Sequence, residues 1–363
     1  MTKEERVLRT IRKETIDYLP SNIYFASHET KVSLMKALKI PSVEKLDEFL
    51  ENHLIITSPM DDVFRFRGDH EFLRDAEKTV FAKIDWKNGV LYDRWGIGYD
   101  IHTDGICIRH FPLRGKDEEI KKYRAPNLDE PGNLALIEED LKKYSGDYLV
   151  VLAGYFGIFE RAWALMGYEE LLMNMVLNPK LVETLLDAIT DHKIAYAELT
   201  VRLGCRIGHT CDDFGWQKGL MFSKDMWSKY YKPRLAKVWK IYKDAGLPVI
   251  HHSCGNITEI IGDMIDIGLD VLEPVQKVMD YNYIKREFGR HITFWGGIGT
   301  QDLLPFGTPE EVRKMAGEVI DTLGKGGGMI ISPDQEIMAD VPLENLVALV
   351  ETIRSKRETV LKG

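Results

Sequence analysis

A short segment in the C-terminal half of the chain carries the side chains best suited to chemistry. The β-branched pair Val249 and Ile250 is typical of a buried strand. His251, His252 and Cys254 follow it, before a Gly-Asn turn. His252 and Cys254 are two positions apart, so their side chains lie on the same side of an extended chain, and an imidazole nitrogen with a thiolate sulfur makes half of a zinc site. The spacing leaves open a hydrogen-bonded His beside a small buried Cys, with no metal.

Metal-capable, polar and aromatic side chains also follow four other runs that are typical of strands. In parallel α/β folds the active site lies where the strands end. We therefore expect these side chains to meet at one edge of a sheet, although a single one, such as Asp213, could equally cap a helix or close a turn. In chain order they are His209, Cys211, Asp212, Asp213, Glu273, Gln276, Trp295, Gln301, Asp334 and Gln335.

The elements that position these side chains follow a repeated pattern after residue 170. A long amphipathic segment ends at a Gly, which tolerates the left-handed conformation that stops a helix, and a short β-branched run follows. The repetition predicts alternating helices and strands around a parallel sheet. The glycines are Gly204, Gly246, Gly268, Gly289 and Gly324.

Two earlier β-branched or apolar runs, Ser21–Phe25 and Tyr148–Ala153, are further predicted strands. With the five above, and without a Gly-rich nucleotide loop, they fit a (β/α)8 TIM barrel better than an open sheet. The eighth strand has no clear signal. The sequence therefore predicts an α/β fold, a (β/α)8 barrel that forms a single domain over residues 1–363.

The N-terminal part of the chain has a sequence pattern different from the repeated one after residue 170. Residues 1–20 and 30–55 have the apolar spacing of helices, and Asn88-Gly89 between Trp86 and Val90 predicts a β-hairpin. We expect residues up to about 95 to form a largely helical extension packed on the barrel.

Composition narrows the class of protein. A formal net charge of -9 with no dense Lys/Arg block argues against nucleic acid as a partner. The N-terminus is charged from Lys3 onward, and the longest uncharged run near the middle, residues 148–159, is too short to span a bilayer. Four cysteines in so long a chain do not form a disulfide framework. We expect a cytoplasmic protein that has neither a membrane nor a nucleic-acid partner.

Taken together, several motifs resemble the uroporphyrinogen decarboxylase superfamily. The resemblance runs over nearly the whole chain, and it implies a (β/α)8 barrel, in agreement with the predicted strands. The segments that carry it are Glu4–Arg12, Asp17–Pro20, Leu247–Ile257, Gly268–Gln276, Thr293–Gln301 and Asp340–Ala348.

The superfamily holds tetrapyrrole decarboxylases and zinc-dependent, corrinoid-linked methyltransferases. The decarboxylases are expected to carry an arginine-containing element near the start, which binds substrate carboxylates, and Asp17–His28 stands there without an arginine. Binding many carboxylates without such a charge would be costly. The methyltransferase branch uses a His-x-Cys-Gly element for zinc, here His252 and Cys254. The resemblance therefore favours a methyltransferase that works with a separate corrinoid-binding protein.

The third metal ligand departs from the family pattern. The methyltransferases take a Cys or His from the segment after the last strand, where this chain has Gln335. A neutral amide oxygen is a poor zinc ligand. Glu273, at the end of the strand after the His-x-Cys strand, is the preferred substitute, and Asp213 and Asp334 are weaker candidates.

Two reactions would use such a site. Zinc could polarise a methyl ether whose methyl group passes to the corrinoid, or it could hold a thiol that accepts the methyl group. Asp213 and His252 are the predicted catalytic residues, with Asp213 as a proton donor or as the carboxylate that holds His252 in one tautomer. A barrel that only binds a corrinoid or tetrapyrrole remains the non-catalytic alternative. Predicted substrate-binding residues are His209, Gln217, Trp295 and Gln335, with Trp216 and Phe294 as possible stacking partners.

Overall fold

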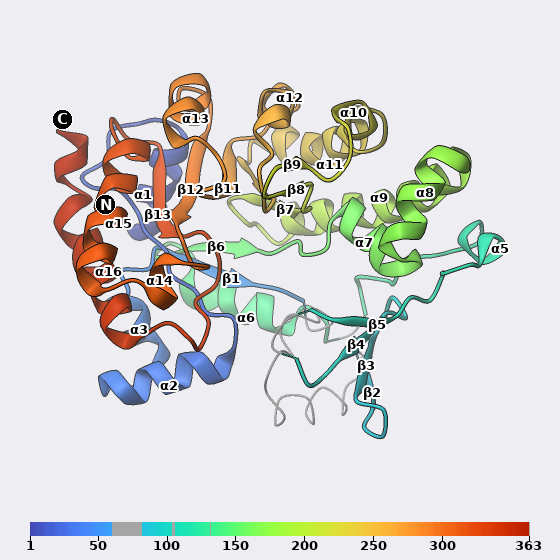
Figure 1. The fold of residues 1–363 in the computed structure, drawn as a ribbon, viewed down its shortest axis with the longest axis horizontal. Coiled ribbons are helices and arrows are strands. Elements are labelled where there is room, and N and C mark those ends of the chain that lie inside the picture. Colours follow the sequence, from blue (N-terminus) through green and yellow to red (C-terminus); the bar gives the residue numbers. More distant parts are fainter. Residues whose placement is uncertain (60–81, 104–105, 131, 363) are drawn as a thin grey trace.

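The computed structural model describes residues 1–59, 82–103, 106–130 and 132–362 (Figure 1). Its helices are α1 (Lys3–Ile11), α2 (His28–Leu38), α3 (Val43–Phe49), α5 (Asp117–Ile120), α6 (Ala135–Tyr144), α7 (Ile158–Met166), α8 (Tyr168–Leu177), α9 (Pro179–Arg202), α10 (Lys224–Tyr230), α11 (Lys232–Asp244), α12 (Ile261–Asp266), α13 (Tyr281–Phe288), α14 (Leu303–Phe306), α15 (Pro309–Leu323) and α16 (Leu343–Lys356). Its strands are β1 (Leu54–Thr57), β2 (Ala82–Asp85), β3 (Val90–Asp93), β4 (Gly98–Asp100), β5 (Ile108–His110), β6 (Leu149–Leu152), β7 (Gly208–Cys211), β8 (Gly215–Trp216), β9 (Gly219–Leu220), β10 (Val249–His252), β11 (Val271–Val275), β12 (Thr293–Ile298) and β13 (Met329–Pro333).

A five-stranded parallel sheet forms the centre of the C-terminal half. Its strands are ordered β13-β12-β11-β10-β7, so each strand pairs with the strand of this sheet that follows it along the chain. Each crossover contains at least one helix, which is the usual connection between parallel strands. The predicted alternation of helix, Gly and strand is confirmed, and the protein has an α/β fold with a parallel sheet.

A second parallel pair, β1 with β6, lies beside this sheet. Ser21 connects the two, because it forms parallel bridges to both Asn52 and Ile331. The predicted strand over 21–25 is therefore reduced to isolated bridges, at Ser21 and at Phe25, which pairs with Ile337.

β1 is the parallel segment that the sequence pattern did not locate. It begins inside the range predicted as helix, because Phe49 and Leu50 continue the helical apolar spacing up to the β-branched run Leu54–Thr57. Because β1 pairs with β6, this part of the predicted N-terminal extension contributes a strand to the parallel layer. The helices predicted over 1–20 and 30–55 are shorter than expected, namely α1, α2 and α3.

The N-terminal helix completes the inner core. α1 turns Val7, Leu8 and Ile11 into a buried cluster formed by residues of six strands and by Ile207, which directly precedes β7. Because these strand residues alternate with outward-facing ones, they point to one side of the parallel layer. The strand and inter-strand members are Leu54, Leu149, Val151, Ile207, Ile250, Val271, Trp295 and Ile330.

The predicted hairpin at Asn88-Gly89 is confirmed. β2 and β3 pair antiparallel across it, and Gly89 has a φ of +66°, which glycine adopts without strain. β4 and β5, which the sequence did not predict, extend the hairpin to a four-stranded antiparallel sheet.

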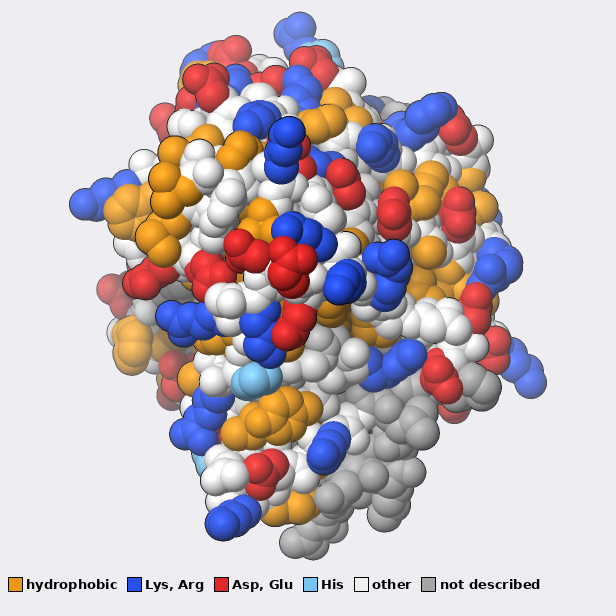
Figure 2. All heavy atoms as spheres, turned by 90° about the vertical axis from the view of Figure 1, so that its right-hand side faces the viewer, with side chains coloured by type: hydrophobic (Ala, Val, Ile, Leu, Met, Phe, Trp, Pro, Cys, Tyr) orange, Lys and Arg blue, Asp and Glu red, His pale blue; other side chains and the backbone are white. Residues whose placement is uncertain are grey.

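The surface carries charges of both signs. On the face drawn in Figure 2, acidic and basic side chains are interspersed, and no broad basic field is present there. Among the described residues, no helix is both long enough and apolar enough to cross a bilayer.

Candidate metal centre at the strand ends

Three neighbouring strands bring the candidate ligands together. β10 lies between β7 and β11, and His252 is in register with Cys211 on one side and Glu273 on the other. The chain then leaves the sheet, and the backbone N–H of Cys254 donates to Asp213 Oδ1 at 2.7 Å. This hydrogen bond ties the loop after β10 to the loop after β7.

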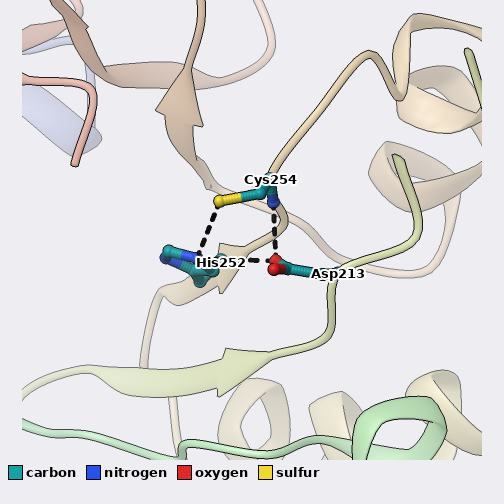
Figure 3. Close-up of side chains that lie close together, drawn as sticks. All are labelled: Asp213, His252 and Cys254. Carbon is teal, nitrogen blue, oxygen red and sulfur yellow. Dashed lines mark hydrogen bonds and ion pairs between the residues drawn. The ribbon is translucent and has the colours of Figure 1, made fainter. Parts of the chain in front are cut away.

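Asp213, His252 and Cys254 point toward one another (Figure 3). His252 Nε2 lies 3.5 Å from Cys254 Sγ and 3.6 Å from Asp213 Oδ1. One ligand atom from each residue lies within 4.8 Å of the others. Of the predicted metal residues, the structure thus brings together His252 and Cys254, and it adds Asp213, the weaker candidate.

Glu273 lies on the opposite side of the imidazole. Its Oε2 is 2.6 Å from His252 Nδ1, and its Oε1 accepts a hydrogen bond from the Tyr24 hydroxyl at 3.2 Å. Burial by itself would lower the pKa of His252, but the carboxylate of Glu273 and the sulfur of Cys254 hold it well above its usual value. Glu273 is likewise buried, yet the charge of His252 keeps its pKa below the usual value. Glu273 is therefore placed to orient His252.

Gln335 also reaches the centre. Its side-chain Nε2 donates to Cys254 Sγ at 2.6 Å, so the amide of the last strand's loop contacts the sulfur that the sequence assigned to the metal. Burial raises the pKa of the Cys254 thiol to about 11. The resemblance placed a metal ligand at this position, and the structure places a hydrogen-bond donor to the sulfur there.

The other predicted substrate-binding residues differ in burial and in the elements that carry them. His209 is the second residue of β7 and is buried. Its Nδ1 accepts from the backbone N–H of Gly154 at 3.0 Å, and burial lowers its pKa to about 4. Gln217 is exposed in the turn of the β8–β9 hairpin. Trp295 is 2% exposed within the inner core cluster. Phe294 is buried in the outer core, whereas Trp216 is half exposed.

Asp212 and Asp334 have partners of their own. Asp212 accepts hydrogen bonds from the backbone N–H groups of Ile158, Phe159 and Glu160, at 2.7, 3.1 and 2.9 Å, and so caps α7. Asp334 accepts from the backbone N–H and hydroxyl of Thr300. The helix-cap role that the sequence left open for Asp213 thus belongs to its neighbour.

Sequence reasoning missed two residues beside the centre. Tyr24 donates a hydrogen bond to Glu273, but the sequence pattern predicted only that the segment of Tyr24 forms a strand. Glu160, on α7, accepts a hydrogen bond from the Cys211 thiol at 3.3 Å, and burial, followed by the charges of Asp213 and Asp212, raises its pKa to about 8. An acidic residue within an apolar helix, Ile158–Met166, was the available signal.

The donor set fits a zinc ion. Zinc prefers nitrogen, sulfur and carboxylate oxygen in tetrahedral geometry, which separates a nitrogen and a sulfur ligand by about 3.6 Å. The separation of His252 Nε2 and Cys254 Sγ is 3.5 Å. A carboxylate that holds the other imidazole nitrogen, as Glu273 does, is the usual support of a metal-binding His.

Comparison with known proteins assigns the family. The family model described as uroporphyrinogen decarboxylase matches residues 89–356. The chain belongs to the uroporphyrinogen decarboxylase family. The resemblance seen in the sequence is thereby confirmed, and the matched range contains every candidate ligand.

Relatives in this family include methyltransferases. The methylcobamide:CoM methyltransferase MtbA of Methanosarcina acetivorans is 26% identical, over 98% of each chain. The methylated-thiol–coenzyme M methyltransferase of Methanosarcina mazei is 25% identical, over 98% of this chain and 89% of its own. Among solved structures, a methyltransferase from Methanosarcina mazei matches with a TM-score of 0.70 and 21% identity, over 98% of this chain and 99% of the other. The last likeness shows a shared fold.

Proposed function

We propose that this protein is a zinc-dependent methyltransferase that moves a methyl group from a corrinoid protein to a small thiol. The observation that carries the proposal is the convergence of Asp213, His252 and Cys254 at the strand ends. The relatives named for methyl transfer support the kind of reaction.

The charge of the donor set distinguishes the two reactions considered above. Cys254 as thiolate and Asp213 as carboxylate balance the two positive charges of zinc, with His252 neutral. A balanced centre is a weak acid for an ether, whereas it leaves a bound thiol electron-rich and reactive. We therefore favour the thiol acceptor over the methyl-ether donor. When bound, zinc supplies the positive charge that lowers the pKa of a substrate thiol.

Asp213 and Glu273 exchange the roles expected from the sequence. Asp213 Oδ1 faces His252 Nε2 and completes the donor set, and Glu273 holds Nδ1. Gln335 donates to Cys254 Sγ, which stabilises a thiolate at that position. These three side chains fix the orientation and charge of the centre.

We also propose that the parallel segments close into a (β/α)8 barrel. Ser21 bridges the five-stranded sheet to the β1–β6 pair, and the backbone N–H of Gly154 just after β6 donates to His209 of β7. In this arrangement the centre lies at the carboxyl-terminal mouth, where a corrinoid-binding partner presents its cobalt.

The decarboxylase alternative is less well supported. The segment in which the decarboxylases carry an arginine here places Tyr24 on Glu273, and the charged groups around it are carboxylates. A site for a many-fold carboxylated tetrapyrrole needs the opposite charge.

The test combines metal content with turnover. Purified wild type is expected to hold one zinc per chain and to transfer the methyl group of methylcobalamin to a thiol, followed by the change in cobalamin absorbance. Cys254→Ala is expected to lose both properties, and Asp213→Ala to weaken zinc by at least about tenfold. Cys205→Ala, a buried cysteine away from the centre, is the matched control. Turnover that persists in Cys254→Ala, or in chelator-treated wild type, would overturn the proposal.

A further inference from the structure

Tyr24 lies outside the strands that carry the candidate ligands, but its hydroxyl reaches the metal centre. The hydroxyl donates to Glu273 Oε1 at 3.2 Å, while Glu273 Oε2 is 2.6 Å from His252 Nδ1. Each contact uses a different oxygen, so the carboxylate is held between the phenol and the imidazole. Tyr24 therefore acts on a candidate ligand through one intermediate side chain.

Strand pairing alone does not fix the carboxylate of Glu273. Register places the backbones of His252 and Glu273 side by side, but several rotatable bonds separate the backbone of a glutamate from its carboxylate. The Glu273 side chain is 5% exposed, so bulk water has little access to it. A buried carboxylate oxygen without a donor is costly. The bond from Tyr24 therefore stabilises one orientation of the carboxylate, and with it one orientation of the imidazole.

The segment that carries Tyr24 is itself fixed by hydrogen bonds along both of its edges. On one edge, the backbone N–H of Ile337 donates to the carbonyl of Tyr24 at 2.8 Å, and the carbonyl of Ile337 accepts from the N–H of Ala26 at 3.0 Å. On the other edge, the Asn52 side chain accepts from the N–H of Ile23 at 2.7 Å and donates to its carbonyl at 2.9 Å. The phenol therefore projects from a backbone that has little freedom to move.

The paired segments supply a second donor to the centre. Gln335 lies two residues before Ile337, and its Nε2 donates to Cys254 Sγ at 2.6 Å. His252 is thus oriented through Glu273 by the N-terminal segment, and Cys254 is contacted directly by the loop after β13. These two segments carry no candidate ligand in the group at the centre, but they support both members of the His-x-Cys pair.

We propose that Tyr24 is a positioning residue of the metal centre. Its hydroxyl fixes the Glu273 carboxylate, and through it the ring of His252, in the orientation that lets Nε2 share a metal ion with Cys254 and Asp213. The inference rests on the proposed function and deepens it, because it extends the machinery of the site to the N-terminal segment. Loss of the hydroxyl should weaken and distort the metal site without removing a ligand.

The experiment compares Tyr24→Phe with Tyr99→Phe. Tyr99 is the matched control, because its hydroxyl also donates to a buried carboxylate, Asp93 Oδ2 at 3.0 Å, but in the antiparallel sheet. Each variant loses one phenol–carboxylate hydrogen bond, so we expect the Tm of the metal-free proteins to fall by similar amounts, about 1–2 °C. Only Tyr24→Phe should lower the zinc affinity, by about tenfold, as measured by competition with a chromophoric chelator.

Cobalt(II) in place of zinc gives a second readout, which depends on the geometry of the ligands and not on the stability of the fold. We expect the visible absorption bands of the Co(II) protein to shift or weaken in Tyr24→Phe, and Tyr99→Phe to reproduce the wild-type spectrum. Wild-type zinc affinity with an unchanged Co(II) spectrum in Tyr24→Phe would overturn the inference. Equal losses of zinc affinity in the two variants would also overturn it, because the Tyr24 hydroxyl would then serve the fold alone.

The inference and the proposed function fail in different ways. Zinc binding and methyl transfer by wild type, with equal zinc affinity in Tyr24→Phe, overturn the inference and leave the function standing. Zinc binding that depends on Tyr24, without methyl transfer to any thiol, overturns the function and supports the inference. A wild type that binds no zinc overturns both.

Discussion

At the scale of single residues, both ring nitrogens of His252 have close partners. Nδ1 donates to Glu273 Oε2, and Nε2 is the ring nitrogen that faces Cys254 Sγ and Asp213 Oδ1. A carboxylate behind an imidazole fixes both its tautomer and its rotation, and this sets which atoms can share a metal. Glu273 is in turn held by Tyr24.

Glu273→Gln is expected to weaken zinc by about 10- to 100-fold without abolishing it, because the amide keeps the shape of the support but loses its charge. Competition with a chromophoric chelator measures the affinity. Asp334→Asn, which also neutralises a buried carboxylate at a strand end but has Thr300 as its partner, should leave the affinity unchanged. A complete loss of zinc in Glu273→Gln would restore Glu273 as the third ligand.

Glu160 makes stability depend on pH. Its folded pKa of about 8 exceeds the ordinary 4.5, so the folded state holds a proton that the unfolded state releases between these values. The free energy of unfolding should therefore fall as pH rises from about 4.5 to 8. Glu160→Gln imitates the protonated form and should flatten this slope by about one proton and raise stability at pH 8. Urea unfolding from pH 5 to 9 measures the slope, with the exposed Glu139→Gln as control; an unchanged slope would contradict the assignment.

At the scale of elements, the β8–β9 hairpin is locked against the loop that follows β10. The backbone N–H of Asn256 donates to the carbonyl of Trp216 at 2.9 Å, and Gly255 has a φ of +82°. A Cβ at Gly255 would meet the backbone of Gly215 and Trp216. This contact and the hydrogen bond from Cys254 to Asp213 hold the two loops that carry the candidate ligands at a fixed separation.

Gly255→Ala should therefore lower the zinc affinity of the candidate centre, in addition to the loss of stability that the strained backbone causes. Gly204→Ala is the matched control, because Gly204 has a similar φ of +76° but open space around it. Both variants should lose about 1 kcal/mol of stability from the left-handed conformation. Only Gly255→Ala should also lower zinc affinity, by at least about tenfold, as measured by chelator competition. Equal zinc affinity in the two variants would show that the close approach does not position the ligands.

At the scale of the whole molecule, the N-terminal third is part of the structural core. α1 packs Val7, Leu8 and Ile11 against strand residues from both parallel sheets, and β1 pairs with β6. The candidate centre lies at the carboxyl ends of the same strands, so the inner cluster supports it from within the layer. Trp295 belongs to this cluster.

Leu8→Ala should destabilise the whole protein by about 3 kcal/mol, because it removes a fully buried side chain from a cluster shared by several strands. Leu177→Ala, at a position 74% exposed on α8, should cost less than about 0.5 kcal/mol. Denaturant unfolding measures both. A single cooperative transition in wild type, lowered in Leu8→Ala, is expected; separate unfolding of the N-terminal part would contradict a shared core.

Local sequence patterns predict the alternation of helices and strands, the hairpin at Asn88-Gly89 and the same-side placement of His252 and Cys254. Each follows from local periodicity, turn chemistry or a two-residue spacing. Which carboxylate faces Nε2 of His252 depends instead on contacts between segments far apart in the chain. Register places Glu273 beside His252, but the rotation of the imidazole depends on partners from three other segments, and the Cys254 N–H brings in Asp213 from 41 positions away. The sequence did not predict β1 or the position of Trp295 in the inner cluster for the same reason. Which strands are neighbours, and toward which side of the sheet a side chain points, are set only when the strands assemble into the layer.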